Sequence, residues 1–137
     1  PTSPRSRYQQ RGHLDLMEFM TSHGAVRLQG GLHLLATLLQ KPGKMDTKGS
    51  MVQELWDAGD KLRIDDYCLC DVLDTYFVHL RLAVLRGRIK PEDEHGMVDD
   101  AKKVIEAHVD EYLGLSEYLG KFQYWMPPGI EDDGLLL

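Results

Sequence analysis

The residues of this 137-residue chain predict a helix-rich fold with little β-structure. Apolar side chains recur at three- and four-residue steps in two long segments, 62–85 and 98–113, which is the spacing of an amphipathic helix. Runs rich in β-branched residues, which a complete α/β domain would need for its strands, are missing. The residues alone therefore favour packed helices over a sheet.

The first half of the chain contains short predicted elements separated by turn residues. The dense apolar segment 13–20 is interpreted as a strand end that passes into a short helix. A leucine-rich helix follows over 32–40, and the sequence Lys41-Pro42-Gly43-Lys44 ends it because proline cannot continue a helix. Ser50 is the predicted N-cap of a further helix that runs to about residue 57, with Gln53 completing a capping box.

The second half contains the two longest predicted helices. The helix over 62–85 ends at Gly87, and its predicted buried stripe consists of Ile64, Cys68, Val72, Leu73, Tyr76, Phe77, Leu80 and Val84. Pro91 and the three acids after it suit the first turn of a second helix, where proline loses no hydrogen bond and the helix dipole favours acids. Gly96 interrupts that turn, so the expected start moves towards residue 97.

Charge limits the classes of function. The net charge of −6 and the pI of about 5.4 argue against a protein that holds nucleic acid by bulk electrostatic attraction, which requires a basic surface. A metal-dependent nuclease remains compatible, because divalent cations neutralise its carboxylates. No apolar run approaches the ~20 residues needed to span a bilayer, and no N-terminal signal is present, so no membrane association is expected.

The two cysteines, Cys68 and Cys70, are too close in sequence for an ordinary structural disulfide. They also lack a second pair with which to form a zinc site, so plain buried thiols are the preferred interpretation. Their use favours a reducing compartment, which means the cytoplasm or an organelle interior and not secretion. Because the sequence begins with Pro1 and not with methionine, we expect a processed chain or a fragment.

The segment 64–71 contains the candidate chemistry. Tyr67 and Asp71 are four residues apart, so on a helix both side chains lie on one face. Asp71 could ligate a hard cation such as Mg²⁺ or Mn²⁺, and the phenol could orient a water molecule that attacks a phosphodiester. On spacing alone, the commoner explanation is a half-buried tyrosine beside a solvent-facing aspartate.

Six short motifs around this pair resemble the predicted 3′–5′ exonucleases that are related to the proofreading domain of family B DNA polymerases. In chain order they are His13-Leu14-Asp15-Leu16-Met17, Leu32-x3-Ala36-x2-Leu39, Pro42-Gly43-Lys44, Gly49-Ser50-x-Val52, Tyr67-Cys68-x2-Asp71-Val72-Leu73-x-Thr75-Tyr76 and Leu80-Arg81-x4-Arg86-Gly87. The resemblance covers roughly residues 8 to 90.

The resemblance implies a ribonuclease H-like α/β fold, of which this chain is a helix-rich C-terminal portion. It implies two-metal chemistry of the DEDD type with Mg²⁺ or Mn²⁺, in which Tyr67 and Asp71 are catalytic and Asp71 is a metal ligand. Asp15 matches a motif between the second and third acidic motifs, which implies a structural or second-shell position. The implied substrate is a single-stranded nucleic acid end, DNA or RNA.

The sequence departs from this family pattern in several places. The Asp-x-Glu of the first motif and the Asn-x3-Phe-Asp of the second have no counterpart. Leu69 and Cys70 replace an expected Glu and Thr, and His33 stands where Asp is usual. We therefore expect the isolated chain to be inactive, since Asp71 alone cannot build a two-metal site.

Two further expectations concern binding. Lys44 and Lys48, together with Lys41, could contact phosphates, although a solvated loop is the commoner explanation of three such lysines. The chain is expected to divide into an irregular lead-in (1–12), the exonuclease-like part (13–90), a helical extension (91–126) and a flexible tail (127–137). The alternative function is a degenerate structural or interaction subunit, with the extension contacting a protein partner or a second copy.

Overall fold

The computed structural model describes residues 14–43 and 49–126, and all its regular elements in these ranges are helical. They are α1 (Leu16–Met20), α2 (Gly31–Leu38), the 3₁₀ helix η1 (Gly49–Met51), α3 (Val52–Asp57), α4 (Lys61–Leu85), α5 (Pro91–Ala107) and α6 (Leu113–Lys121). The helix-rich prediction is confirmed. The described residues contain no strand, so the ribonuclease H-like sheet implied by the resemblance stays a prediction.

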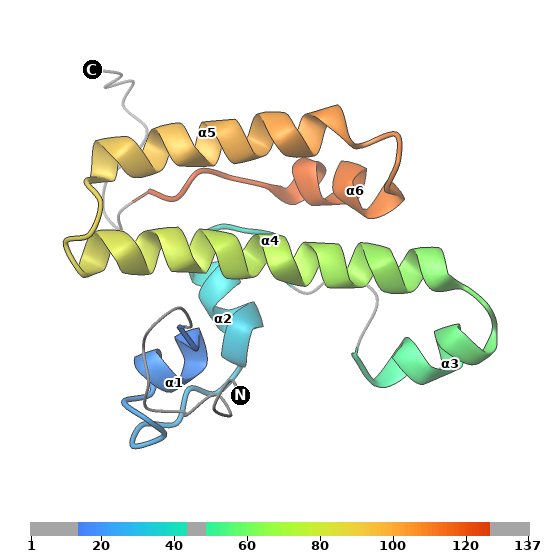
Figure 1. Ribbon diagram of the computed structural model, residues 1–137, viewed down its shortest axis with the longest axis horizontal. Helices are drawn as coiled ribbons and strands as arrows, with labels where there is room; N and C mark the ends of the chain where they lie inside the picture. Colours follow the sequence, from blue (N-terminus) through green and yellow to red (C-terminus); the bar gives the residue numbers. More distant parts are fainter. Residues whose placement is uncertain (1–13, 44–48, 127–137) are drawn as a thin grey trace, which may run out of the picture.

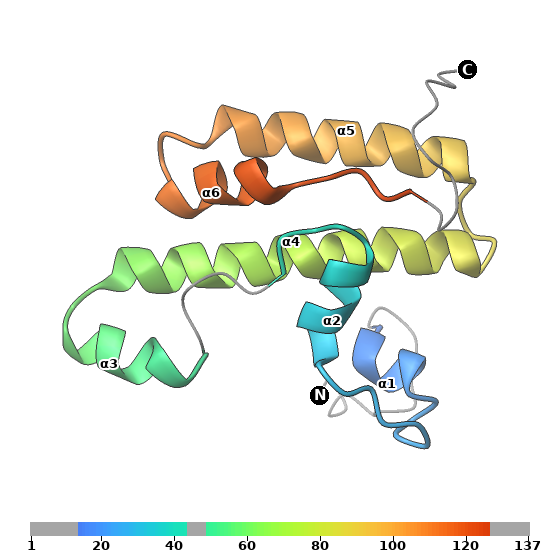
Figure 2. The same cartoon turned by 180° about the vertical axis from the view of Figure 1, so that it is seen from behind.

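The 25-residue helix α4 is the central helix of the fold. Helix α5 runs back along one side of it, and α6 and the extended segment 122–126 lie between these two helices (Figure 1). Helices α1, α2 and α3 lie on the other side of α4, as the view from behind also shows (Figure 2). Side chains of α4 are therefore buried on two opposite sides.

Local sequence signals set both ends of α4. Asp60 caps the N-terminus, where its carboxylate accepts a hydrogen bond of 3.3 Å from the Arg63 N–H. At the other end Gly87 adopts φ +65°, and the N–H groups of Gly87 and Arg88 donate to the carbonyls of Val84 and Ala83. These two bonds form a Schellman motif, so the predicted stop at Gly87 has its expected physical cause.

A single cluster of buried side chains joins α4, α5 and α6. Its members are Cys70, Phe77, Leu80, Val98, Ile105, Leu115 and Tyr118. Phe122 and Tyr124 of the extended segment pack against this cluster, with the Phe77 and Phe122 rings edge to face at 5.3 Å. Because burial of one such large side chain contributes about 1.5–3 kcal/mol, this cluster holds the helices together.

The predicted buried stripe of α4 is partly wrong. Phe77 and Leu80 are buried, but Cys68, Val72 and Tyr76 are exposed. The buried face instead includes Asp74. Apolar periodicity does not predict this position, because aspartate is a polar residue. A buried carboxylate is tolerated only where specific hydrogen bonds satisfy it.

Helix α5 differs from its prediction at both ends. It begins at Pro91, so the expected shift to residue 97 is wrong: Gly96 lies inside the helix. It also ends at Ala107, and the predicted stripe that continued to Leu113 is divided by a turn before α6. No helix of the described ranges is both long and apolar enough to cross a membrane.

The short elements of the first half differ in detail. Leu14 and Asp15 are not paired in a strand, and the helix of this segment begins at Leu16; His13 lies outside the described residues. Ser50 lies within η1, and α3 begins after Met51 without a side-chain cap, so the predicted capping box is wrong. The helix over 32–40 is confirmed as α2, one residue earlier at its start and two at its end.

Candidate functional site

Tyr67 and Asp71 lie one turn apart on α4, as their spacing predicts. The two side chains interact directly: a hydrogen bond to the Asp71 carboxylate, together with partial burial, raises the pKa of the Tyr67 phenol. The phenol therefore stays protonated and donates to the carboxylate. Both residues are half-buried, so the pair remains accessible to a ligand at the surface of α4.

Gly49, the first residue of η1, faces the Tyr67 hydroxyl. A Cβ atom at position 49 would lie 3.3 Å from that oxygen, so a side chain there would require the hydroxyl to shift by a few tenths of an ångström. The motif Gly49-Ser50-x-Val52 and the motif that contains Tyr67 thus meet in space.

Asp74, one turn beyond Asp71, is 1% exposed and is the most buried carboxylate of the described residues. The Tyr118 hydroxyl of α6 donates a 2.7 Å hydrogen bond to its Oδ1, and the Gly43 N–H donates to it as well. Burial nevertheless raises the pKa of Asp74, and the nearby Asp71 charge raises it further. Asp74 thus links α4 to α6 and to the segment at Gly43, one helical turn after Asp71.

The Pro42-Gly43-Lys44 motif enters the same region through Gly43. Gly43 is buried with φ +66°, and a Cβ at this position would lie 2.5 Å from Nδ1 of His33. His33 also lies close enough to Asp74 for its charge to favour the ionised carboxylate. His33, which stands where the family pattern has Asp, therefore lies in the surroundings of Asp74.

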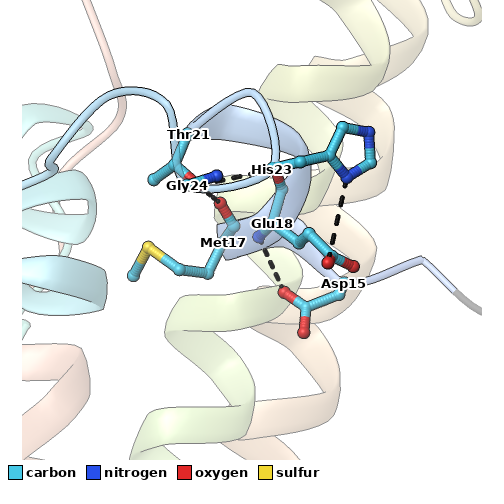
Figure 3. A network of polar contacts seen from close by, with 6 residues as sticks. All are labelled: Asp15, Met17, Glu18, Thr21, His23 and Gly24. Atoms are coloured by element: carbon cyan, nitrogen blue, oxygen red, sulfur yellow. Dashed lines mark hydrogen bonds and ion pairs between the residues drawn. The ribbon is translucent and has the colours of Figure 1, made fainter. Parts of the chain in front are cut away.

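Asp15 lies elsewhere. Its carboxylate caps α1 by accepting a 2.9 Å hydrogen bond from the Glu18 N–H, within the network shown in Figure 3. Helix α1 reaches α4 where the Arg86 guanidinium covers the Phe19 ring at 4.4 Å. Arg86 is fifteen residues after Asp71, which is roughly 22 Å along a helix axis. The structure thus gives Asp15 a capping role and does not bring it to Asp71.

The predicted phosphate contacts cannot be placed. Lys44 and Lys48 lie outside the described residues, although Gly43 and Gly49 on either side of them both border the cluster of Asp71 and Asp74. Lys41 is only 6% exposed, so its interpretation as part of a solvated loop is wrong. Its ammonium group donates to the carbonyls of Leu39 and Gln123 and lies over the Phe122 ring at 4.2 Å.

The described donor groups do not fit a complete two-metal site. No group of three or more His, Cys, Asp or Glu side chains within 14–43 and 49–126 could hold a metal ion. Asp71 offers one carboxylate, and Asp74 is buried and already hydrogen-bonded. Two ions roughly 3.5–4 Å apart need ligands on several sides, which these residues do not supply.

The described residues form a helical domain with one accessible phenol–carboxylate pair, Tyr67 and Asp71. The buried carboxylate of Asp74 lies one turn further along the same helix. The chain belongs to the family of predicted 3′–5′ exonucleases related to the exonuclease domain of PolB, whose family model matches residues 3–123. The match extends beyond the motifs, through α5 and α6. No curated protein and no solved structure matches the chain.

Proposed function

We propose that this chain forms the part of a 3′–5′ exonuclease domain that contributes Tyr67 and Asp71 to phosphodiester hydrolysis at a single-stranded nucleic acid end. The observation that supports this proposal best is the pair itself. The phenol donates to the carboxylate on one accessible face of α4, and a glycine of another family motif lies against the hydroxyl. Membership of the exonuclease-related family gives the arrangement its chemical context.

The proposal includes the incompleteness of the site. The family resemblance implies Mg²⁺ or Mn²⁺, but the described residues provide too few ligands. Hydrolysis therefore requires further acidic residues, of the Asp-x-Glu and Asn-x3-Phe-Asp types, from a polypeptide segment that this sequence lacks. Without them the chain is inactive.

The coding sequence that precedes Pro1 tests this directly. An Asp-x-Glu and an Asn-x3-Phe-Asp motif in the same reading frame would support the enzymatic proposal. An upstream sequence that encodes neither would contradict it for this gene, and would favour the interaction subunit instead.

The second candidate is an interaction subunit, and exposed apolar side chains favour it. Leu113 is 83% exposed, and Leu62, Leu85 and Val104 are also largely exposed although they lie on helices. Side chains of this kind are common at protein interfaces, while scattered single ones are normal on any surface. The predicted helical extension supplies two of them, Val104 and Leu113.

Surface substitutions test this alternative better than shortening the chain, because removal of α5 and α6 would expose the core face of α4. Leu113→Ser and Leu62→Ser should each weaken self-association or partner capture while the far-ultraviolet circular dichroism is unchanged. Exposed Lys103→Met is the matched control. A strictly monomeric wild-type chain that also recruits no partner would contradict the alternative.

A further inference from the structure

Helix α4 has an exposed face without charged side chains. Over residues 68–79 the exposed side chains of this helix are Cys68, Val72, Thr75, Tyr76 and His79. They follow one another at steps of three and four residues, so they form one stripe, which we call the uncharged face. It extends for roughly 16 Å along the helix axis. Val72 is 62% exposed and Tyr76 is 38% exposed, so the face is also partly apolar.

The exposed side of α5 shows what a solvated helix of this chain looks like. Five of its exposed side chains are charged, namely Glu92, Asp93, Asp100, Lys103 and Glu106. Over residues 68–79, in contrast, α4 has an uncharged exposed side in addition to the sides that pack on α2, α5 and α6. A helix that lacks a charged outer face is typically enclosed by other elements. The uncharged face is therefore a contact surface for polypeptide other than the described residues.

The two views of the molecule agree on which side of α4 is open. In Figure 2 the segment that follows α2 crosses the near side of α4. No described element crosses the side of α4 that is nearest the viewer in Figure 1. One long side of the central helix is thus left uncovered by the part of the chain that the structure describes.

Asp71 lies at the edge of the uncharged face. Its neighbours one turn away on this side are Cys68 and Thr75, which are both exposed. On its other side they are Tyr67 and Asp74. That side is already occupied, because η1 lies against the Tyr67 hydroxyl and α6 donates a hydrogen bond to Asp74. Groups from outside the described residues therefore reach Asp71 across the uncharged face.

The missing metal ligands are such groups. The described residues do not supply the carboxylates that a two-metal site needs beside Asp71. In an Asp-x-Glu motif the two acids are two residues apart, so on a β-strand both side chains point to the same side. A strand that brings this motif to Asp71 also brings the next residues of the same side to α4. Uncharged residues at these positions would match the uncharged face.

On the basis of the proposed function, we propose that the uncharged face is the docking surface for the segment that carries the missing acidic motifs. The contact is made by an uncharged side of the strand that contains the Asp-x-Glu motif. Docking encloses α4 on its open side, buries Val72 and Tyr76, and leaves the acids beside Asp71. It also explains why Cys68, Val72 and Tyr76 have the periodicity of a buried stripe although they are exposed in this chain.

Cys68 is a natural reporter of docking, because it lies on the uncharged face, whereas Cys70 is buried in the core. The 137-residue chain and a chain extended through the coding sequence that precedes Pro1 are treated with N-ethylmaleimide, and peptide mass spectrometry follows each cysteine. Cys68 should react at least about tenfold more slowly in the extended chain, because its thiol is covered there. Slow reaction of Cys70 shows that each chain is folded. A cysteine introduced by Lys103→Cys, on the charged side of α5, should react equally fast in both.

Two valines of nearly equal exposure provide a matched pair of substitutions. Val72 is 62% exposed on the uncharged face, and Val104 is 61% exposed on α5. In the extended chain, Val72→Lys should lower the midpoint of urea denaturation, because it buries a charge in the contact, and Val104→Lys should change it little. In the 137-residue chain the two variants should have similar midpoints.

Several outcomes would overturn the proposal. Equal Cys68 rates in the two folded chains would do so, and so would equal midpoints for the two valine variants of the extended chain. Protection of Cys68 that rises with the concentration of the 137-residue chain would identify a second copy as the occupant instead. An upstream coding sequence without the acidic motifs would contradict docking and the proposed function together.

The readouts separate docking from catalysis, because neither of them measures nuclease activity. An extended chain that shortens oligonucleotides but leaves Cys68 reactive would contradict docking and keep the proposed function. An extended chain that protects Cys68 but has no activity would keep docking and contradict the proposed function.

Discussion

The hydroxyl of Tyr118 donates a 2.7 Å hydrogen bond to Oδ1 of Asp74, and both side chains are almost completely excluded from solvent. This bond joins α6 to α4 across 44 residues of sequence. It also fixes the turn of α4 that carries Asp71, because Asp74 lies one turn further along the same helix.

Tyr118→Phe should lower the free energy of unfolding by about 1–3 kcal/mol, because it leaves the buried Asp74 carboxylate without its side-chain donor. Urea denaturation measures the change. Tyr76→Phe is the matched control, since Tyr76 is exposed, and it should shift the midpoint little. Equal midpoints for Tyr118→Phe and the wild type would show that the bond contributes nothing.

Asp74→Asn should become increasingly stable relative to the wild type as the pH rises above the ordinary aspartate pKa of about 4. Burial raises the pKa of Asp74 in the folded state, so between the unfolded and the folded value the native protein binds more protons. The wild type therefore loses stability over this interval, by about 1.4 kcal/mol for each unit of the pKa difference, and the variant with the neutral amide does not. Denaturant titrations at several pH values measure this, with exposed Asp65→Asn as the control. A pH-independent difference would contradict the assignment.

Gly43→Ala should cost more stability than Gly87→Ala, although both glycines have almost the same backbone conformation, φ +66° and +65°. The backbone strain of about 1–2 kcal/mol is common to both. Only at position 43 does the new methyl group approach another side chain, at 2.5 Å from His33 Nδ1, whereas nothing lies within 4 Å of it at position 87. Thermal unfolding of the two variants isolates this steric cost. Equal losses would mean that His33 moves aside freely.

The two thiols should differ in reactivity by about a thousandfold at pH 8. Cys68 is exposed, whereas burial raises the pKa of Cys70 to about 12 and leaves almost no thiolate. Reaction with Ellman's reagent should release one equivalent quickly and the second only after unfolding in urea. Cys68→Ala should remove the fast phase, and Cys70→Ala should retain it. A fast phase in Cys68→Ala would contradict the burial of Cys70.

The sequence predicts helices well where a terminus has its own chemical signal. The end of α4 at Gly87 is predicted because glycine capping is a local property. Pro91 is also the first residue of α5, although Gly96 moved the expected start towards residue 97. The Tyr67–Asp71 pair is predicted for the same reason, since a four-residue spacing on a helix determines which side chains are neighbours.

The rest depends on tertiary contacts that no local pattern contains. Asp74 and Lys41 are buried because partners 44 and 82 residues away, Tyr118 and Gln123, satisfy them. Hydropathy alone predicts that both side chains are exposed to solvent. For α4, it therefore predicts a buried face that does not include Asp74. One sequence signal does indicate the burial of Asp74. Cys70, Asp74 and Phe77 are spaced at four and three residues, which places them on the same face of a helix.

The central claim is that Asp71 belongs to a hydrolytic site that this chain completes only in part. The most direct test incubates 5′-labelled single-stranded DNA and RNA with Mn²⁺ and measures shortening of the oligonucleotides. The 137-residue chain is compared with a chain that is extended through the coding sequence preceding Pro1. We predict intact oligonucleotides with the printed chain and stepwise loss from the 3′ end with the extended one. That activity should be abolished by Asp71→Asn and kept by exposed Asp65→Asn. Undiminished shortening by the extended Asp71→Asn variant would contradict the claim.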